Sequence, residues 1–225
     1  MAPEPSPPVA GGPGTDVAGA GTRRRGRPPA QRSAQTEADI LRAARVRFSR
    51  TGYARTSVAQ IAGEAGVTSR AVYHYVESKP ELFGRTLAAA HHRVRDEVVT
   101  RVEGRRDARD ALHGWIDAFR ALFDEDPSLV QFLSVAVTEA ERNRELVGTQ
   151  TAGPAGITGL NRWLVERAVR HGELAPGVDP AGVVALLEVF GAGLAVLARD
   201  DGGQEWRAMF DALCRLIDGT LLTAR

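Results

Sequence analysis

The sequence is poor in several features whose absence narrows the range of functions. Only one cysteine, Cys214, occurs in 225 residues, so no disulfide can form within the chain, which fits a reducing compartment. No apolar run reaches the roughly 18 residues that a membrane-spanning helix needs. The first 22 residues are dominated by proline, glycine and alanine and lack the apolar stretch of a secretory signal. We therefore expect a cytoplasmic protein.

Positive charge is concentrated at one end of the chain. Residues 1–79 contain 11 arginines and Lys79, the only lysine, against six acidic residues, which leaves a net charge of +6. The remaining residues contain 17 basic and 22 acidic side chains and carry a net charge of −5. A basic front segment favours a polyanionic partner such as nucleic acid, although a chance imbalance of charge would look the same.

Strand-like alternation of polar and apolar residues is also absent, whereas helical spacing recurs from Ala34 onward. The sequence therefore predicts an all-α fold in which a disordered Pro/Gly/Ala-rich tail with a basic arm (1–33) precedes a series of helices. The expected helices span 34–50, 58–65, 69–75, 79–102, 107–124, 127–137, 138–147, 154–171, 179–199 and 203–223, of which 127–137 and 138–147 could form one broken helix.

A helix-turn-helix motif is predicted over 57–76. Ser57 begins a short helix with Gln60 at the capping-box spacing, and Gly66 ends that helix. Thr68 can then cap a second short helix, 69–75. In this motif the second helix enters the DNA major groove, where its side chains meet phosphates and base edges.

The second helix and its borders carry side chains suited to DNA. Arg70 can form paired hydrogen bonds with guanine, while hydroxyl and imidazole groups can donate to phosphate. Lys79, in the first turn of the next helix, can meet the phosphate backbone, whereas Val72 is expected to face the core. The candidate DNA contacts of this domain are Ser57, Thr68, Ser69, Arg70, Ala71, Tyr73, His74 and Lys79.

The segment FSRTGYARTSVAQIAGEAGVTSRAVYHYVESKPEL, Phe48 to Leu82, resembles the signature of the TetR family of transcriptional regulators. One departure is Val76, where the family often has phenylalanine, so the core side chain is smaller here. The resemblance covers residues 34–87 and implies a DNA-binding domain there, followed by a helical effector-binding and dimerisation domain at 88–225. It also assigns DNA contacts to Thr68, Ser69, Arg70, Ala71, Tyr73, His74 and Lys79.

The basic arm contains the sequence RGRPP, from Arg25 to Pro29, which resembles the core of an AT-hook. Arg25 and Arg27 could enter the narrow minor groove of A·T-rich DNA, where negative potential attracts arginine. The alternative is a solvated tail that adds only nonspecific attraction.

Aromatic residues of the second domain are candidates for an effector pocket. Trp115 and Phe119 share one face of a helix, and apolar side chains between helices form most small-molecule sites. A plain core is the alternative for this stripe, and Glu139 and His113 could supply polar contacts. His91 and His92 point about 100° apart on a helix, so we expect no metal site there. The candidate pocket residues are Trp115, Phe119, Phe123, Phe132, Val135 and Trp163.

The last two predicted helices are apolar enough to pair with a second copy of the chain. Two helices from each protomer would form a four-helix bundle across a two-fold axis, as in the dimers of the family that the motif resembles. The alternative is a core within one chain, and Cys214 is expected to be a small buried hydrophobe in the same stripe. The candidate interface residues are Leu186, Phe190, Gly193, Leu197, Phe210, Leu213 and Ile217.

These features together predict a homodimeric, DNA-binding transcriptional regulator, most simply a repressor that a small lipophilic effector releases from a palindromic operator. We expect no cofactor and no enzymatic activity. Tyr75 and Lys79 have the Tyr-x-x-x-Lys spacing of short-chain dehydrogenases, but a helix boundary is predicted between them and no strand precedes a glycine-rich phosphate loop. A nonspecific architectural DNA binder, a small-molecule carrier and a transcriptional activator remain as alternatives.

Overall fold

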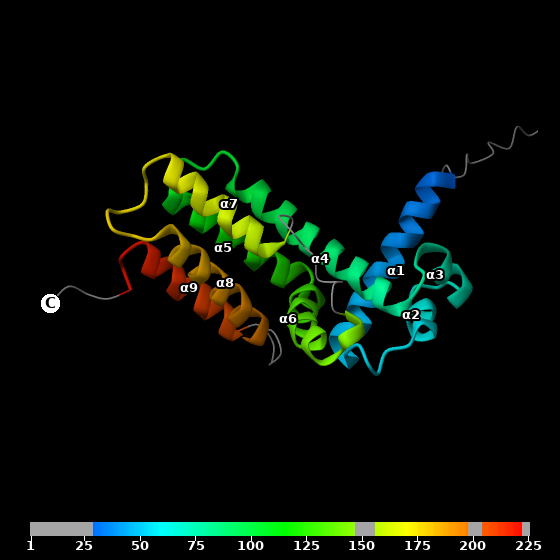
Figure 1. Ribbon diagram of the computed structural model, residues 1–225. Coiled ribbons are helices and arrows are strands. Elements are labelled where there is room, and N and C mark those ends of the chain that lie inside the picture. The colour runs from blue at the N-terminus through cyan, green and yellow to red at the C-terminus, as the bar shows by residue number, and fades with distance from the viewer. Residues whose placement is uncertain (1–28, 147–155, 198–203, 222–225) are drawn as a thin grey trace, which may run out of the picture.

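The computed structural model describes residues 29–146, 156–197 and 204–221. Within these ranges the fold is all-α and contains no strand, so the predicted fold class is confirmed. Figure 1 shows an elongated arrangement with α1, α2 and α3 at one end and the later helices at the other. The elements are α1 (Pro29–Thr51), α2 (Val58–Glu64), α3 (Ser69–Tyr75), α4 (Lys79–Val102), α5 (Ala108–Glu125), α6 (Pro127–Arg142), the 3₁₀ helix η1 (Arg144–Leu146), α7 (Ile157–Arg170), α8 (Pro180–Leu197) and α9 (Gln204–Ile217).

Local capping chemistry separates the first helices. Gly52 follows α1 with a φ of +74°, a left-handed conformation that glycine adopts without strain. The Ser57 hydroxyl accepts a hydrogen bond from the Gln60 amide (3.2 Å), and the Gln60 side chain accepts one from the Ser57 amide (2.9 Å), so the predicted capping box is present. Thr68 and Ser78 cap α3 and α4 through their hydroxyl oxygens.

Three helices differ from the sequence prediction. The last one, α9, was expected over 203–223 but ends at Ile217, shortly before Gly219, which has a φ of +69°. The other two are α1 and α6. α1 begins at Pro29 rather than near Ala34, because proline is tolerated in the first helical turn, where an amide would have no acceptor. The added turn carries the Ser33 hydroxyl to 3.2 Å from the Tyr75 hydroxyl of α3. The expected segments 127–137 and 138–147 form one continuous helix, α6, which the short η1 follows.

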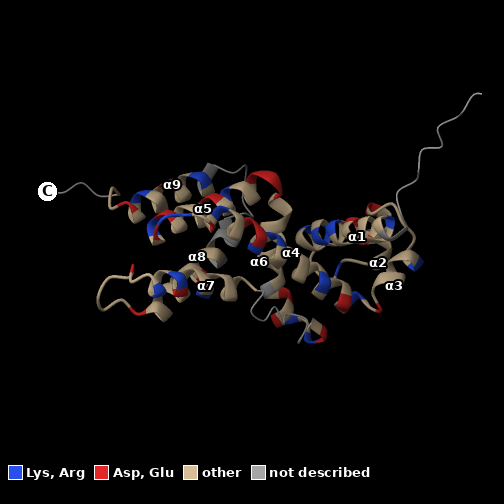
Figure 2. Ribbon diagram, turned by 90° about the horizontal axis from the view of Figure 1, so that it is seen from above, with Lys and Arg blue, Asp and Glu red and all other residues tan. Residues whose placement is uncertain are grey.

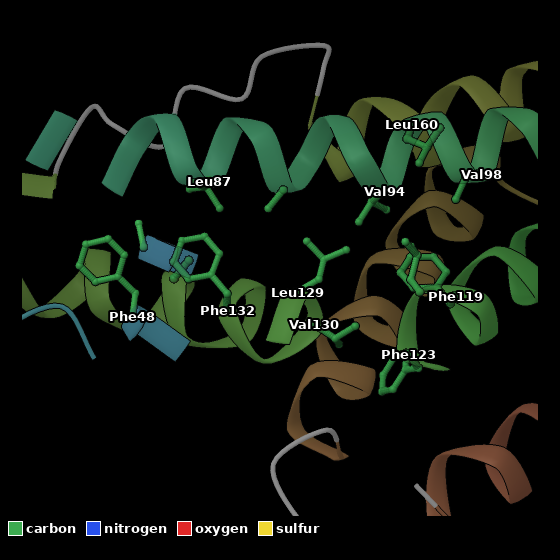
Figure 3. Packing of buried hydrophobic residues seen from close by; sticks show 14 of the residues in the cluster. Phe48, Leu87, Val94, Val98, Phe119, Phe123, Leu129, Val130, Phe132 and Leu160 are labelled. Carbon is green, nitrogen blue, oxygen red and sulfur yellow. The ribbon is translucent and has the colours of Figure 1, made fainter. Parts of the chain in front are cut away.

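α4 links the two ends of the molecule. Its first turns bury Leu82 and Phe83 in the amino-terminal unit of α1 to α3, and Val94 and Val98 are buried farther along the same face. Figure 3 shows Leu87, Val94 and Val98 pointing from α4 toward the helices that cover it. None of the helices in the described ranges is both long and apolar enough to cross a bilayer.

A group of four aromatic side chains, which we call the junction cluster, joins the amino-terminal unit to α6. Phe48 of α1, Tyr53 of the following turn and Phe83 of α4 have ring centroids 5.1 to 5.9 Å apart. Phe132 of α6 completes the cluster, 5.3 Å from Phe83 and 6.3 Å from Phe48 (Figure 3). All four side chains are nearly or fully buried, so the amino-terminal unit and α6 share one apolar core.

An ion pair adds a polar connection at the amino-terminal end of α6. The half-buried Arg45 guanidinium of α1 pairs with the Asp126 carboxylate, and Arg45 Nε donates to the Ser128 hydroxyl at 3.4 Å. Burial lowers the pKa of Arg45 and Asp126 opposes that shift, so the arginine remains charged. The amino-terminal unit is therefore held on α6 by both apolar burial and charge.

Candidate nucleic-acid interface

α3 turns one side chain inward and several outward. Val72 is fully buried, which anchors the helix to α2, whereas Arg70 and His74 are exposed. Tyr73 is 51% exposed although it is aromatic. Among the ion pairs of the described residues none involves Arg70, so its guanidinium is available to an external acceptor. An exposed arginine, tyrosine and histidine on one short helix form a surface suited to a groove in DNA.

A hollow of about 640 Å³ lies between α3 and α1. The hollow brings together five of the predicted DNA contacts, while Ser69 is half-buried at the start of α3 and Ser57 is exposed at the start of α2. Thr36 of α1 was missed by sequence reasoning because only tertiary packing brings α1 beside α3. The lining residues are Thr36, Thr68, Arg70, Ala71, Tyr73, His74 and Tyr75.

The capping hydroxyls keep a donor for phosphate. Thr68 Oγ1 accepts from the Ala71 amide at 3.2 Å, and Ser57 Oγ accepts from the Gln60 amide. A hydroxyl carries a donor as well as acceptor lone pairs, so each cap can still donate outward to a phosphate oxygen. The same two residues can therefore fix the helix starts and contact DNA.

Basic residues continue onto α1. Figure 2 shows blue segments on both α1 and α3. Arg32 is exposed in the first turns of α1, while Arg47 pairs with Glu64 of α2 at 3.0 Å. Arg25 and Arg27 of the basic arm lie outside the described residues.

Lys79 has different surroundings from the other predicted contacts. Its Nζ lies 4.1 Å from the ring centroid of Tyr53, and the side chain is half-buried. Burial lowers the pKa of Lys79, and the carboxylates of Glu145 and Glu139 act in the opposite direction. α3 ends at Tyr75 and α4 begins at Lys79, so the dehydrogenase-like spacing does not place these two side chains on one helix.

Among the described residues, the aromatic members of the predicted effector pocket fall into separate packing groups. Trp115 and Phe119 of α5 pack against each other at 4.6 Å, whereas Phe132 belongs to the junction cluster. Phe123 lies in a third group, 5.0 Å from Trp206 and 6.0 Å from Phe210 of α9. Val135 and Trp163 are half-buried. The shared helix face of Trp115 and Phe119 marked them as buried positions, but the sequence could not tell which helix each ring would meet.

A buried polar pair near Trp115 was not predicted. The indole Nε1 of Trp115 donates to Oδ1 of the fully buried Asn161 of α7 at 3.2 Å. Of the two polar residues predicted for the pocket, His113 contacts Asp218 (2.9 Å) and Glu139 contacts the turn after α1. A separate hollow of about 480 Å³ lies between α7 and α8, lined by Thr158, Arg162, Val165, Glu166, Pro180, Ala181, Val184, Ala185 and Glu188.

α8 and α9 leave large apolar side chains in solvent. Leu186 is 59% exposed and Val189 is 69% exposed on α8, and Leu216 of α9 is 59% exposed. Phe210, which the sequence assigned to a subunit interface, is fully buried against α5, because Phe123 and Trp206 cover it within the same chain. Of the other candidates, Gly193 is exposed, Phe190, Leu213 and Ile217 are half-buried, and the side chain of Leu197 is not among those described.

The lone cysteine lies among packed side chains of α5 and α9. Cys214 is half-buried, and its Sγ accepts a weak hydrogen bond from Arg120 Nη2 at 3.8 Å. Burial raises the pKa of this thiol, which disfavours the reactive thiolate. Within the described residues, no three His, Cys, Asp or Glu side chains gather as a metal site would require.

Comparison with known proteins relates the amino-terminal unit to one family. Residues 40–86 match the family model described as bacterial regulatory proteins, tetR family. No curated protein sequence matches the chain. The matched segment runs from the buried Ile40 of α1 to Thr86 of α4, and it contains the entire predicted helix-turn-helix.

Solved structures match over most of the chain. A TetR-family transcriptional regulator from Rhodococcus sp. is 18% identical with a TM-score of 0.67, covering 84% of this chain and 100% of that one. The fatty acid degradation regulator FadR from Bacillus halodurans is 18% identical with a TM-score of 0.71, covering 82% and 99%. FadR from Bacillus subtilis, solved in complex with stearoyl-CoA, is 15% identical with a TM-score of 0.68, covering 82% and 99%. At these identities the likeness is one of fold.

Proposed function

We propose that the chain is a member of the TetR family of bacterial regulatory proteins, whose model matches residues 40–86, and that it is a cytoplasmic repressor that binds a two-fold-symmetric operator and is released by a small lipophilic effector. The observation that carries this proposal is the hollow between α1 and α3. There an unpaired Arg70, the exposed Tyr73 and His74, and the capping Thr68 converge on one surface.

Each residue of this surface has a distinct role in the proposal. Arg70 reads a guanine through two parallel hydrogen bonds, and Tyr73 and Ala71 offer apolar contact to a thymine methyl group. Thr68, Ser57, Ser69 and His74 donate to phosphates and so set the register of the helix in the groove. Arg25 and Arg27 precede α1 and would add minor-groove contacts beside the same site.

A dimer places two such surfaces on one face of DNA. The exposed Leu186 and Val189 of α8 and Leu216 of α9 form the apolar face that a second copy would cover, together with Gly193. Large exposed apolar patches are uncommon on monomers. The α3 helix of each protomer would be the recognition helix. Two such helices about 34–36 Å apart would read the two halves of a palindrome.

The effector site is proposed within the helices that follow α4. The apolar core around Trp115 and Phe119, with Asn161 as its buried polar group, suits a lipophilic molecule. The complex of a structural relative with stearoyl-CoA supports this ligand class. Effector binding would tilt α4 and α6 and alter the spacing of the recognition helices, so DNA must weaken effector binding by the same factor.

Selection of bound duplexes from a random DNA pool tests the proposal. The expected result is one enriched motif with two-fold symmetry, bound by a dimer. Enrichment of A·T-rich DNA without a motif would instead indicate an architectural binder that uses its basic arm. Absence of binding at low salt would contradict the DNA-binding function. Reporter transcription from the enriched motif then separates repression from activation.

A further inference from the structure

Lys79 lies against the domain junction rather than in the hollow on α3. It is the only lysine of the chain and the first residue of α4. Its Nζ sits 4.1 Å above the ring centroid of Tyr53, which is 1% exposed and packs on Phe48 and Phe83. An aromatic ring face attracts a cation through its quadrupole, and more strongly when the cation is partly desolvated. The lysine is thus bound to the turn that follows α1.

The same turn is in contact with α6. A Cβ added to Gly52 would lie 2.6 Å from Oε1 of Glu139, so this carboxylate packs directly on the backbone of the turn. Asn143 Nδ2 donates to Glu139 Oε2 at 2.7 Å and fixes its orientation. The space beside Gly52 is therefore filled by an oriented carboxylate from α6.

The carboxylates of α6 and η1 favour the charged form of Lys79. Glu145 of η1 and Glu139 of α6 both raise the pKa of the ammonium against the effect of burial. Burial raises the pKa of the Tyr53 phenol, and Glu145 adds to that shift. α6 and η1 lie on the side of the amino-terminal unit away from α3 (Figure 1). The ammonium therefore lies on the Tyr53 ring, beside the turn that Glu139 of α6 contacts.

We propose that Lys79 is a positioning residue that ties the start of α4, and with it α3, to α6 and η1 through Tyr53, Glu139 and Glu145. Its contribution to operator binding is then the orientation of the recognition helix rather than a hydrogen bond to phosphate. This inference concerns the domain junction and extends the proposed function without depending on the identity of the operator.

A double-mutant cycle, measured as urea unfolding midpoints, tests the proposed interaction of Lys79 with α6 in the absence of DNA. Lys79→Met keeps the aliphatic stem but removes the charge, and Glu139→Gln removes the facing charge but keeps an amide oxygen for Asn143. Each single change should lower the unfolding midpoint, and the double variant should lie close to Lys79→Met alone, because neighbours in one interaction are not additive. The matched control is Glu103→Gln at the far end of α4, which should add independently to Lys79→Met.

Additive effects of Lys79→Met and Glu139→Gln would overturn the proposal. Lys79→Arg provides a second measurement if the methionine variant unfolds, because a guanidinium also stacks on an aromatic face. If Lys79→Arg unfolds at the wild-type urea midpoint, the result supports the positioning role of Lys79. A midpoint as low as that of Lys79→Met contradicts this role.

The salt dependence of DNA binding distinguishes positioning from phosphate contact. Loss of one phosphate contact lowers the slope of log K against log salt by about 0.9. We expect Lys79→Met to weaken binding to a mixed-sequence duplex while leaving this slope unchanged, and a decrease of the full size would overturn the proposal. If the wild-type protein binds no duplex at all, the proposed function fails, whereas the urea cycle still decides the role of Lys79.

Discussion

Truncation of Phe132 is the most informative test of how the two ends of the molecule are joined. Phe132 is 0% exposed and is the only member of the junction cluster that comes from α6. Its ring meets Phe83 edge-on at 5.3 Å and stacks near Phe48 at 6.3 Å. Phe132→Ala should therefore destabilise the whole protein and loosen the amino-terminal unit from α6, rather than simply empty an effector pocket.

The expected magnitude follows from core truncations. Replacing a buried phenylalanine by alanine costs about 3–5 kcal/mol, which is a large part of the roughly 5–15 kcal/mol of a typical domain. For a chain of this size each kcal/mol lowers the melting temperature by about 2–4 °C, so the decrease should be on the order of 10 °C. Circular dichroism at a fixed protein concentration measures it, because a dimer makes stability depend on concentration.

Val178→Ala is the matched control. Val178 is 43% exposed in the turn between α7 and α8, so this truncation should change stability by less than about 0.5 kcal/mol. A Phe132→Ala loss no larger than that of the control would refute the assignment of Phe132 to a packed junction. Loss of effector binding by Phe132→Ala with normal stability would instead support the prediction that the ring lines a pocket.

Four further predictions concern separate sites. Arg70→Ala should cost about 1–3 kcal/mol of operator affinity and relax the preference at one base pair, as measured by competition with single-base variants of the operator. Leu186→Glu should convert the dimer to a monomer in analytical ultracentrifugation, and an unchanged dimer would exclude this face as the interface. Thr68→Ala removes the cap of α3 and should lower stability by about 1 kcal/mol in urea unfolding. Burial lowers the pKa of His91 below its ordinary 6.5, so the unfolded chain binds this proton more readily than the folded chain. The stability of the protein should therefore fall as the pH drops below about 6.5. His91→Gln should reduce this dependence of the melting temperature on pH.

The sequence alone determined the helical fold and the position of the helix-turn-helix. The capping oxygens of Ser57, Thr68 and Ser78 act within four residues of their own position, so short-range spacing is enough to place the starts of α2, α3 and α4. The inward Val72 and the outward Arg70 follow from helical periodicity in the same way. For this reason most of the predicted contacts on α3 do converge at one hollow.

The tertiary structure decided which partner each buried or charged side chain has. Periodicity marks Phe132 and Phe210 as apolar positions, but only packing shows that the first meets the amino-terminal unit and the second meets α5. Lys79 reads as a phosphate contact in sequence, yet its ammonium lies on the ring of Tyr53, which is 26 positions earlier in the chain. Hydrophobic burial is nondirectional and charge interactions act through space, so neither specifies a partner until the chain has folded.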